Sequence, residues 1–103
     1  MASDAGLSHS EGDCRLFSQN TPPLLRSLRA AAATSDREAL SATAHRLKGS
    51  AANIGAAQMA ALCHRIEDCA AGDQPAELQQ VLGQLERHAA EVEAALARAA
   101  EGP

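Results

Sequence analysis

Apolar residues recur at helical spacing along most of the chain. After Asp36, the steps between apolar positions are four, three, four and three residues, at Leu40, Ala44, Leu47, Ala51 and Ile54. Such steps form the narrow one-sided seam of a bundle helix. Two more stripes follow, at Met59, Leu62, Cys63, Ile66 and Ala70, and at Leu78, Leu82, Leu85, Ala89, Val92 and Leu96. Because the breaks between stripes are short, the pattern predicts an all-α, antiparallel four-helix bundle.

The N-terminal part of the chain predicts the first bundle helix and a short extra helix before it. Thr21 followed by Pro22 is a helix start signal, because proline is tolerated where a backbone N–H has no helical partner. The bundle helix is expected to run from Pro22 to about Ala33. Its inward positions are Leu24, Leu25, Leu28 and Ala32. The short extra helix is expected over residues 11–19 and contributes Phe17.

Turn and capping residues mark the other boundaries. Ser35-Asp36-Arg37-Glu38 matches a capping box, in which the Ser35 hydroxyl accepts from the third helical N–H and Glu38 reaches back. Gly55 is a helix C-terminal signal, and Asp73-Gln74-Pro75 opens the last helix. At 103 residues the chain has the length of one domain. We expect a flexible leader at 1–10, the bundle at 11–100 and a flexible tail at 101–103.

Composition supports helices and argues against several classes of function. Alanine is the commonest residue and Phe17 is the only aromatic one, which favours helix over strand. The formal net charge of −4 argues against electrostatic capture of nucleic acid or of an anionic membrane. No apolar run approaches the ~20 residues that span a bilayer.

The expected location is the cytoplasm. The N-terminus lacks a basic stretch followed by an apolar one, so we expect no secretory signal. The three cysteines, Cys14, Cys63 and Cys69, cannot all pair within one chain, and their spacing matches no zinc site. Buried thiols in a reducing compartment are therefore expected, without an assigned role. The sequence gives no sign of an oligomer, and we expect a monomer.

His45 lies at the centre of the most distinctive cluster of residues. It follows the inward Ala44, so it is expected at the edge of the seam. Lys48 and Gly49 come three and four residues later and share its face of the helix. Lys48 is the only lysine in the chain, beside eight arginines. A lysine there can bind an anion carried by His45, and a glycine leaves room for that anion and its donor.

Helix geometry brings a second group of residues to His45. Ten residues separate His45 from the turn at Gly55, so residues about ten beyond the turn return to the level of His45. That stretch contains His64 and Glu67. Glu67 can accept a hydrogen bond from one imidazole nitrogen and leave the other free as a nucleophile. It can equally form a surface ion pair with Arg65 or another cation, and His64 can be a bystander.

These residues resemble a known family. The run His45-Arg46-Leu47-Lys48-Gly49-Ser50-Ala51, followed by Leu62-Cys63-His64-Arg65-Ile66-Glu67, is similar to the signature region of histidine-containing phosphotransfer (HPt) domains. The resemblance extends from about Phe17 to Leu96. It implies that His45 is the phosphorylated residue and that Lys48 and Gly49 lie next to the phosphoryl group. It also implies Glu67 beside the imidazole and, more loosely, His64 near it.

The resemblance implies a phosphocarrier in a two-component phosphorelay. His45 would accept a phosphoryl group from a receiver-domain aspartate and pass it to another receiver, with Mg²⁺ supplied by the receiver and no cofactor of its own. The chain lacks nucleotide-binding motifs, so it is not expected to be a kinase. The expected partners are response-regulator receiver domains. The sequence leaves open which receivers these are, and whether the chain stands alone or belongs to a hybrid sensor histidine kinase.

Two alternatives remain open from the residues themselves. A helical interaction module would bind a receiver or a partner helix without being phosphorylated. A metal-binding bundle would use His45, His64 and Glu67 as ligands.

Overall fold

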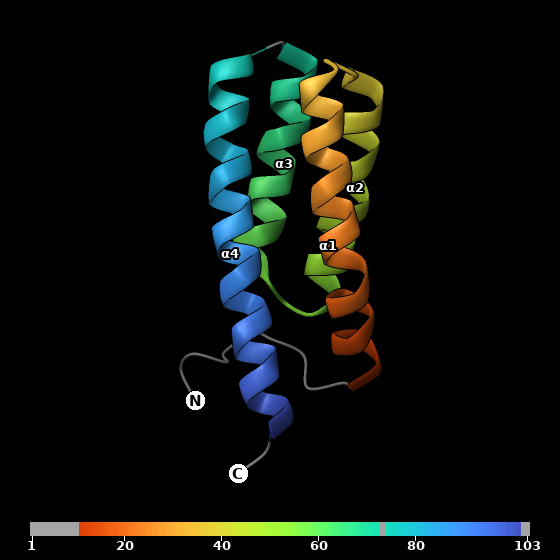
Figure 1. The fold of residues 1–103 in the computed structure, drawn as a ribbon, viewed down its shortest axis with the longest axis vertical. Coiled ribbons are helices and arrows are strands. Elements are labelled where there is room, and N and C mark those ends of the chain that lie inside the picture. The colour runs from red at the N-terminus through yellow and green to blue at the C-terminus, as the bar shows by residue number, and fades with distance from the viewer. Residues whose placement is uncertain (1–10, 73, 102–103) are drawn as a thin grey trace.

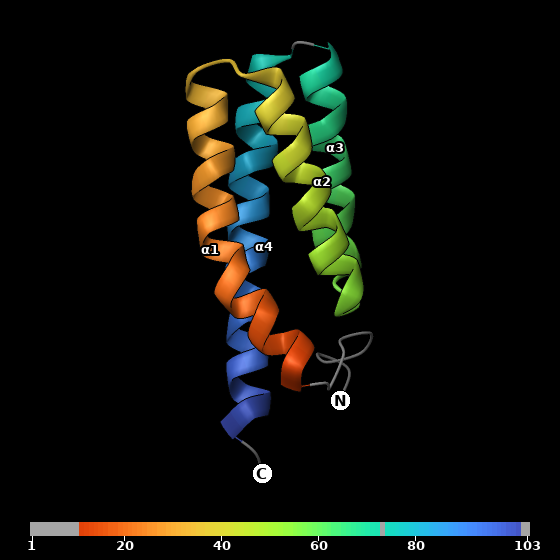
Figure 2. The same ribbon diagram turned by 90° about the vertical axis from the view of Figure 1, so that its right-hand side faces the viewer.

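Four α-helices follow one another in the computed structural model, which describes residues 11–72 and 74–101. They are α1 (Glu11–Ala33), α2 (Arg37–Asn53), α3 (Ala57–Gly72) and α4 (Pro75–Glu101). Each helix packs antiparallel to the next, and α1 contacts α4 to close the bundle (Figures 1 and 2). Figure 1 shows α1 and α4 extending beyond α2 and α3 at one end. The predicted all-α four-helix bundle is confirmed.

The apolar stripes form the core of the bundle. The four predicted positions on α2 are buried, as are Ile54 just after its end and all five positions on α3. On α4 the predicted positions are buried except Val92, which packs partly exposed against the core. Leu28 of α1 is fully buried, and Leu24, Leu25 and Ala32 pack against the core. Among the described residues, no helix is long and apolar enough to cross a membrane.

The prediction of a separate short helix over residues 11–19 is wrong. α1 runs without a break from Glu11 to Ala33, and Pro22 and Pro23 lie inside it. Each proline removes one helical N–H donor, which bends a helix, and Figure 2 shows α1 changing direction in its N-terminal half. Phe17 and Thr21 are both 1% exposed, so continuous packing across this segment holds the helix together.

The start of α2 also differs from the prediction. Ser35 has a φ of 55° and belongs to the turn that ends α1, where the Asp36 N–H donates to the Ala31 carbonyl at 2.9 Å. The N-cap is instead Asp36, whose side chain accepts from the Ala39 N–H at 3.1 Å. Ser35 cannot cap α2 because its left-handed backbone already closes α1.

The other predicted boundaries agree with the structure. Gly55 has a φ of 78°, and the Ala56 N–H donates to the Ala51 carbonyl at 2.8 Å, which closes α2. α3 ends at Gly72 and α4 begins at Pro75. α4 includes Glu101, the first residue of the predicted tail. The predicted leader at 1–10 and the rest of the tail lie outside the described residues.

Side-chain contacts also join α1 to α4. Arg29 donates from Nε and Nη2 to the two carboxylate oxygens of Glu86, at 2.7 and 2.8 Å, and from Nη1 to Gln79. This two-point bond lowers the pKa of the Glu86 carboxyl, with partial burial acting in the opposite direction. Ser18 donates to Glu93 farther along the same pair of helices. These contacts hold the two longest helices in register.

Candidate functional site

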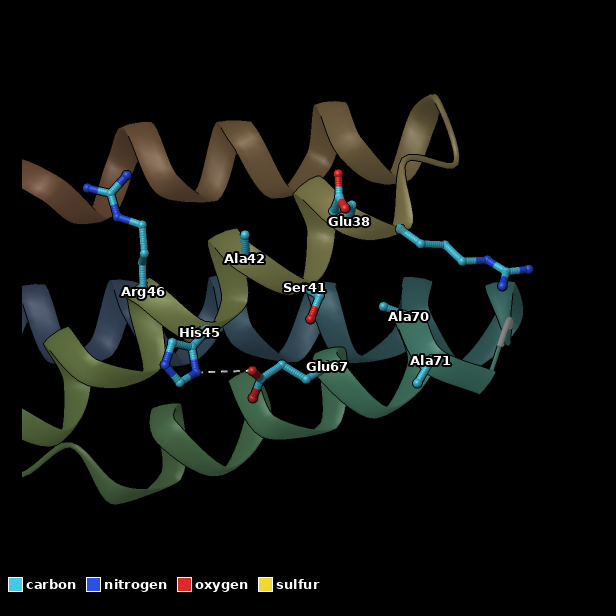
Figure 3. A pocket seen from close by; sticks show the side chains of 9 residues that line it. Glu38, Ser41, Ala42, His45, Arg46, Glu67, Ala70 and Ala71 are labelled. Atoms are coloured by element: carbon cyan, nitrogen blue, oxygen red, sulfur yellow. Dashed lines mark hydrogen bonds and ion pairs between the residues drawn. The ribbon is translucent and has the colours of Figure 1, made fainter.

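His45 projects from α2 at the edge of the core. Its neighbour Ala44 and the next seam residue Leu47 are both fully buried, which fixes the rotation of the helix. The imidazole consequently lies outside the core, and 72% of its side-chain surface is exposed. Figure 3 shows the ring between α2 and α3, facing Glu67. The position expected from the seam is the one observed.

Glu67 of α3 contacts both His45 and Lys48 of α2. Its Oε1 accepts from the Lys48 Nζ at 2.8 Å, and its Oε2 lies 3.2 Å from the His45 Nδ1. Only 20% of the Glu67 side chain is exposed, against 30% for Lys48. The hairpin formed by α2 and α3 therefore brings two predicted site residues, His45 and Lys48, to the carboxylate of a third, Glu67.

The charge of Glu67 determines which nitrogen of the neutral His45 imidazole carries the proton. Partial burial acts to raise the pKa of Glu67, but the hydrogen bond and charge of Lys48, followed by those of His45, outweigh it and lower the pKa below its ordinary value. An ionised carboxylate can only accept hydrogen bonds, so the neutral ring carries its proton on Nδ1. The Nε2 lone pair then lies on the far side of the ring, available to an electrophile.

Gly49 follows His45 by four residues on α2 and adds no side chain to that face of the helix. The residue is exposed, and a Cβ atom added to it would meet nothing within 4 Å. A glycine inside a helix costs about 1 kcal/mol relative to alanine. Packing within this chain gives no reason for that cost, because alanine would fit.

His64 reaches the same carboxylate without bonding to it. Its Nδ1 lies 3.7 Å from the Glu67 Oε1, and its Nε2 lies 3.8 Å from the Asp68 Oδ2. These distances are too long for hydrogen bonds. Within residues 11–72 and 74–101, no group of three or more His, Cys, Asp or Glu side chains is arranged to hold a metal ion. The structure places His64 at the border of the site.

Cys63 lies beneath the site, in the core. It is fully buried, and burial, followed by the charge of Glu67, raises the pKa of its thiol to about 12. A protonated buried thiol is a poor nucleophile. Cys69 is also buried and Cys14 packs partly buried against the core. The buried position predicted for Cys63 is confirmed.

A shallow groove of about 800 Å³ opens beside His45, between the N-terminal half of α2 and the C-terminal half of α3 (Figure 3). We call it the His45 groove, and its lining residues are Arg37, Glu38, Ser41, Ala42, His45, Arg46, Glu67, Ala70 and Ala71. None of the motifs described above indicated it. Helical spacing could have done so, because Ser41 precedes His45 by four residues and Ala71 follows Glu67 by four.

Comparison with known proteins identifies the family. The family model described as "Hpt domain" matches residues 14–102. The fold is similar to the crystal structure of histidine-containing phosphotransfer protein B (HptB) from Pseudomonas aeruginosa PAO1, with a TM-score of 0.80 and 31% sequence identity over 84% of this chain and 75% of that one. A search of curated proteins gives no match. The chain therefore belongs to the HPt domain family, whose members are phosphocarriers rather than kinases, and has a histidine phosphotransfer role in a phosphorelay with receiver domains.

Proposed function

We propose that His45 is the residue that carries the phosphoryl group, on Nε2. The observation that carries this proposal is the exposed imidazole whose Nδ1 faces the ionised carboxylate of Glu67 at 3.2 Å. His88 of α4 is only 35% exposed in its side chain and lies 3.6 Å from Glu91, with no lysine at its side in the described residues. His64 makes no hydrogen bond with Glu67 or Asp68. Of the histidines that the structure describes, His45 has the surroundings that a nucleophile requires.

The transfer step can be written from these contacts. The Nε2 lone pair attacks the phosphorus of a receiver's aspartyl phosphate, the N–P bond forms, and the bond from phosphorus to the aspartate oxygen breaks. The aspartate carboxylate leaves with the electron pair. The ring keeps its proton on Nδ1 and becomes positively charged, and Glu67 stabilises that charge at hydrogen-bond distance. Transfer to a second receiver reverses these bond changes.

Lys48 and Gly49 have supporting roles in this proposal. Lys48 is one helical turn from His45, and its Nζ donates to Glu67 at 2.8 Å. Its ammonium group balances part of the negative charge that arrives with the phosphoryl group. Gly49 keeps the approach to Nε2 clear of side chains. Mg²⁺ is supplied by the receiver, where it neutralises charge on the phosphoryl oxygens, and this chain needs no cofactor of its own.

The partners that we propose are response-regulator receiver domains, encoded separately or joined to a hybrid sensor histidine kinase. We also propose that the chain works as a monomer, because one bundle contains every residue of the site. The cytoplasm is the proposed location, since the buried Cys63 and Cys69 are free thiols and a reducing compartment keeps thiols in that state.

A phosphotransfer assay tests the assignment. The chain is incubated with a phosphorylated receiver domain, and the label that it acquires is tested for stability in acid and in alkali. We expect an acid-labile, alkali-stable phosphoramidate bond that is lost in His45→Gln and retained in His64→Gln and His88→Gln. A tightly bound but unlabelled chain would contradict the proposal and favour an interaction module. Label retained in His45→Gln would place the phosphoryl group elsewhere.

A further inference from the structure

Two adjacent prolines interrupt the hydrogen bonding of α1. Pro22 and Pro23 lie inside the helix and have no N–H to donate. The carbonyls of Ser18 and Gln19, four residues earlier, therefore lose the donors that the helical pattern would supply. The residue before a proline also prefers an extended backbone, which here disfavours helix at two successive positions. We call the part of α1 that precedes the prolines, residues 11–21, the N-terminal arm, and Figure 2 shows that α1 changes direction in this half.

Thr21, the last residue of the N-terminal arm, buries a hydroxyl group that forms no hydrogen bond. The residue is 1% exposed, and its Oγ1 has no partner within residues 11–72 and 74–101. A buried hydroxyl group without a partner destabilises the conformation that buries it, and water bonds to such a group once it is exposed. A valine side chain has nearly the same shape and does not carry this cost. The packed position of the arm is therefore less stable than its shape alone would allow.

The N-terminal arm is held against the bundle by one large core side chain and by a bond to α4. Phe17 is 1% exposed and belongs to the main core cluster, and Cys14 packs partly buried against that cluster. The Ser18 hydroxyl donates to the Glu93 carboxylate of α4 at 2.9 Å. Segments with few buried apolar side chains open at a lower free energy than the rest of a fold. The arm has this character, and its junction with the prolines is the point where it can separate.

We propose that the N-terminal arm is a lid, which opens at its junction with Pro22 while the rest of the bundle stays folded. Opening withdraws Phe17 from the core, breaks the bond to Glu93 and exposes the Thr21 hydroxyl group to water. The core side chains that Phe17 packs against become accessible at that end of the bundle. The α2–α3 hairpin that carries His45 is outside the arm, so the open form keeps this hairpin assembled.

Amide hydrogen exchange of the folded chain, followed by NMR at low denaturant concentrations, tests the proposal. The probes are the amides of residues 16–20, within the arm, and those of Leu62 and Ile66, buried in α3. We expect the arm amides to exchange about a hundredfold faster than the α3 amides, with one shared opening free energy and a weak dependence on denaturant, because local opening exposes little surface. Protection that rises residue by residue from 16 to 20 would show fraying of the helix end and overturn the proposal. Protection equal to that of the α3 amides would overturn it too.

Two substitutions shift the opening equilibrium in opposite directions. Thr21→Val removes the unpartnered hydroxyl group from the closed form and should slow exchange of the arm amides about tenfold. Ser18→Ala removes the bond to Glu93 and should speed this exchange about threefold. Thr43→Val is the matched control, because Thr43 is partly buried on α2, outside the arm, and should leave the exchange of the arm amides unchanged. Arm exchange that neither Thr21→Val nor Ser18→Ala changes would contradict the lid.

Labelling by phosphoramidate checks that the lid and the α2–α3 hairpin are independent. This small donor loses ammonia as its P–N bond breaks and a new N–P bond forms on the imidazole. We expect Thr21→Val and Ser18→Ala to be labelled within about twofold of the unmodified chain, because substitutions distant from a site act independently of it. A labelling rate that follows the exchange rate of the arm amides would show that opening disturbs the hairpin, contrary to the proposal.

Discussion

Replacing Glu67 with glutamine tests the electrostatics of the site most sharply. The substitution keeps the size and hydrogen-bonding capacity of the side chain and removes its charge. Glu67 accepts at 2.8 Å from Lys48 and lies 3.2 Å from the His45 Nδ1, so both contacts lose their ionic partner. An amide also no longer requires the imidazole proton to lie on Nδ1, because its nitrogen can donate to an unprotonated Nδ1.

The expected magnitudes follow from exposure and distance. Lys48 and Glu67 keep 30% and 20% of their side-chain surfaces exposed, so solvent screens the pair and its loss should cost about 1 kcal/mol of stability or less. For a domain of this size that is a decrease in Tm of roughly 4–8 °C at most. A charge-assisted hydrogen bond is worth ~1.5–3 kcal/mol, and the 72% exposure of the His45 side chain places it at the lower end. Phosphotransfer should therefore slow about tenfold, the equivalent of ~1.4 kcal/mol in the barrier.

Two assays check this prediction. Rapid-quench kinetics with a phosphorylated receiver measure the rate, and long-range ¹H–¹⁵N NMR reports which imidazole nitrogen carries the proton. Glu77→Gln is the matched control, because Glu77 also pairs with a cation, Arg65 at 3.2 Å, away from His45. We expect Glu67→Gln to slow transfer and to populate the Nε2–H tautomer, and Glu77→Gln to do neither. An unchanged rate together with an unchanged tautomer would refute the orienting role and leave Glu67 as a surface ion pair.

Three further predictions concern charge, pH and backbone. Lys48→Met should raise the pKa of Glu67, because it removes the strongest interaction that lowers this pKa. A ¹³C NMR titration of the Glu67 carboxyl should show the rise, and an unchanged pKa would contradict the assigned cause. Glu86→Gln should lower the free energy of unfolding at pH 7 by about 0.5–1 kcal/mol, since Arg29 and Glu86 are both partly exposed. The folded-state pKa of Glu86 is depressed, so this stability is present above the unfolded pKa of ~4.3 and is lost as the pH falls through the folded-state pKa. The free energies of unfolding of the unmodified chain and of Glu86→Gln should therefore converge near pH 3. A difference between them that stays constant with pH would be evidence against the linkage. Gly49→Ala should stabilise the helix by ~1 kcal/mol while slowing transfer from receivers, and equal transfer rates would show that the open space has no role.

The fold was predictable because the helix seams are regular. The steps of three and four residues from Leu40 to Ile54 determine which side of α2 is buried, and that rotation places His45 outside the core. Gly55 sets the level of the turn, so counting residues on either side of it brings Glu67 opposite His45. The proximity of His45 and Glu67 therefore follows from helical geometry.

The failed predictions concern local signals that packing overrides. Pro22 reads as a helix start, yet the burial of Phe17 and Thr21 keeps α1 continuous across it. Ser35 reads as an N-cap, but closing α1 requires a left-handed residue at that position, and Asp36 becomes the cap. Helical spacing is the only sequence signal of the His45 groove, because its short side chains form a groove only when two helices place them side by side.

The phosphorylated atom is the most direct test of the account. The ¹⁵N-labelled chain is phosphorylated by phosphoramidate and by a receiver, and ³¹P and long-range ¹H–¹⁵N NMR identify the nitrogen that is bonded to phosphorus. We predict phosphorus on Nε2 of His45, with the proton retained on Nδ1 opposite Glu67. Phosphorus on Nδ1 of His45, or on the ring of another histidine, would contradict it.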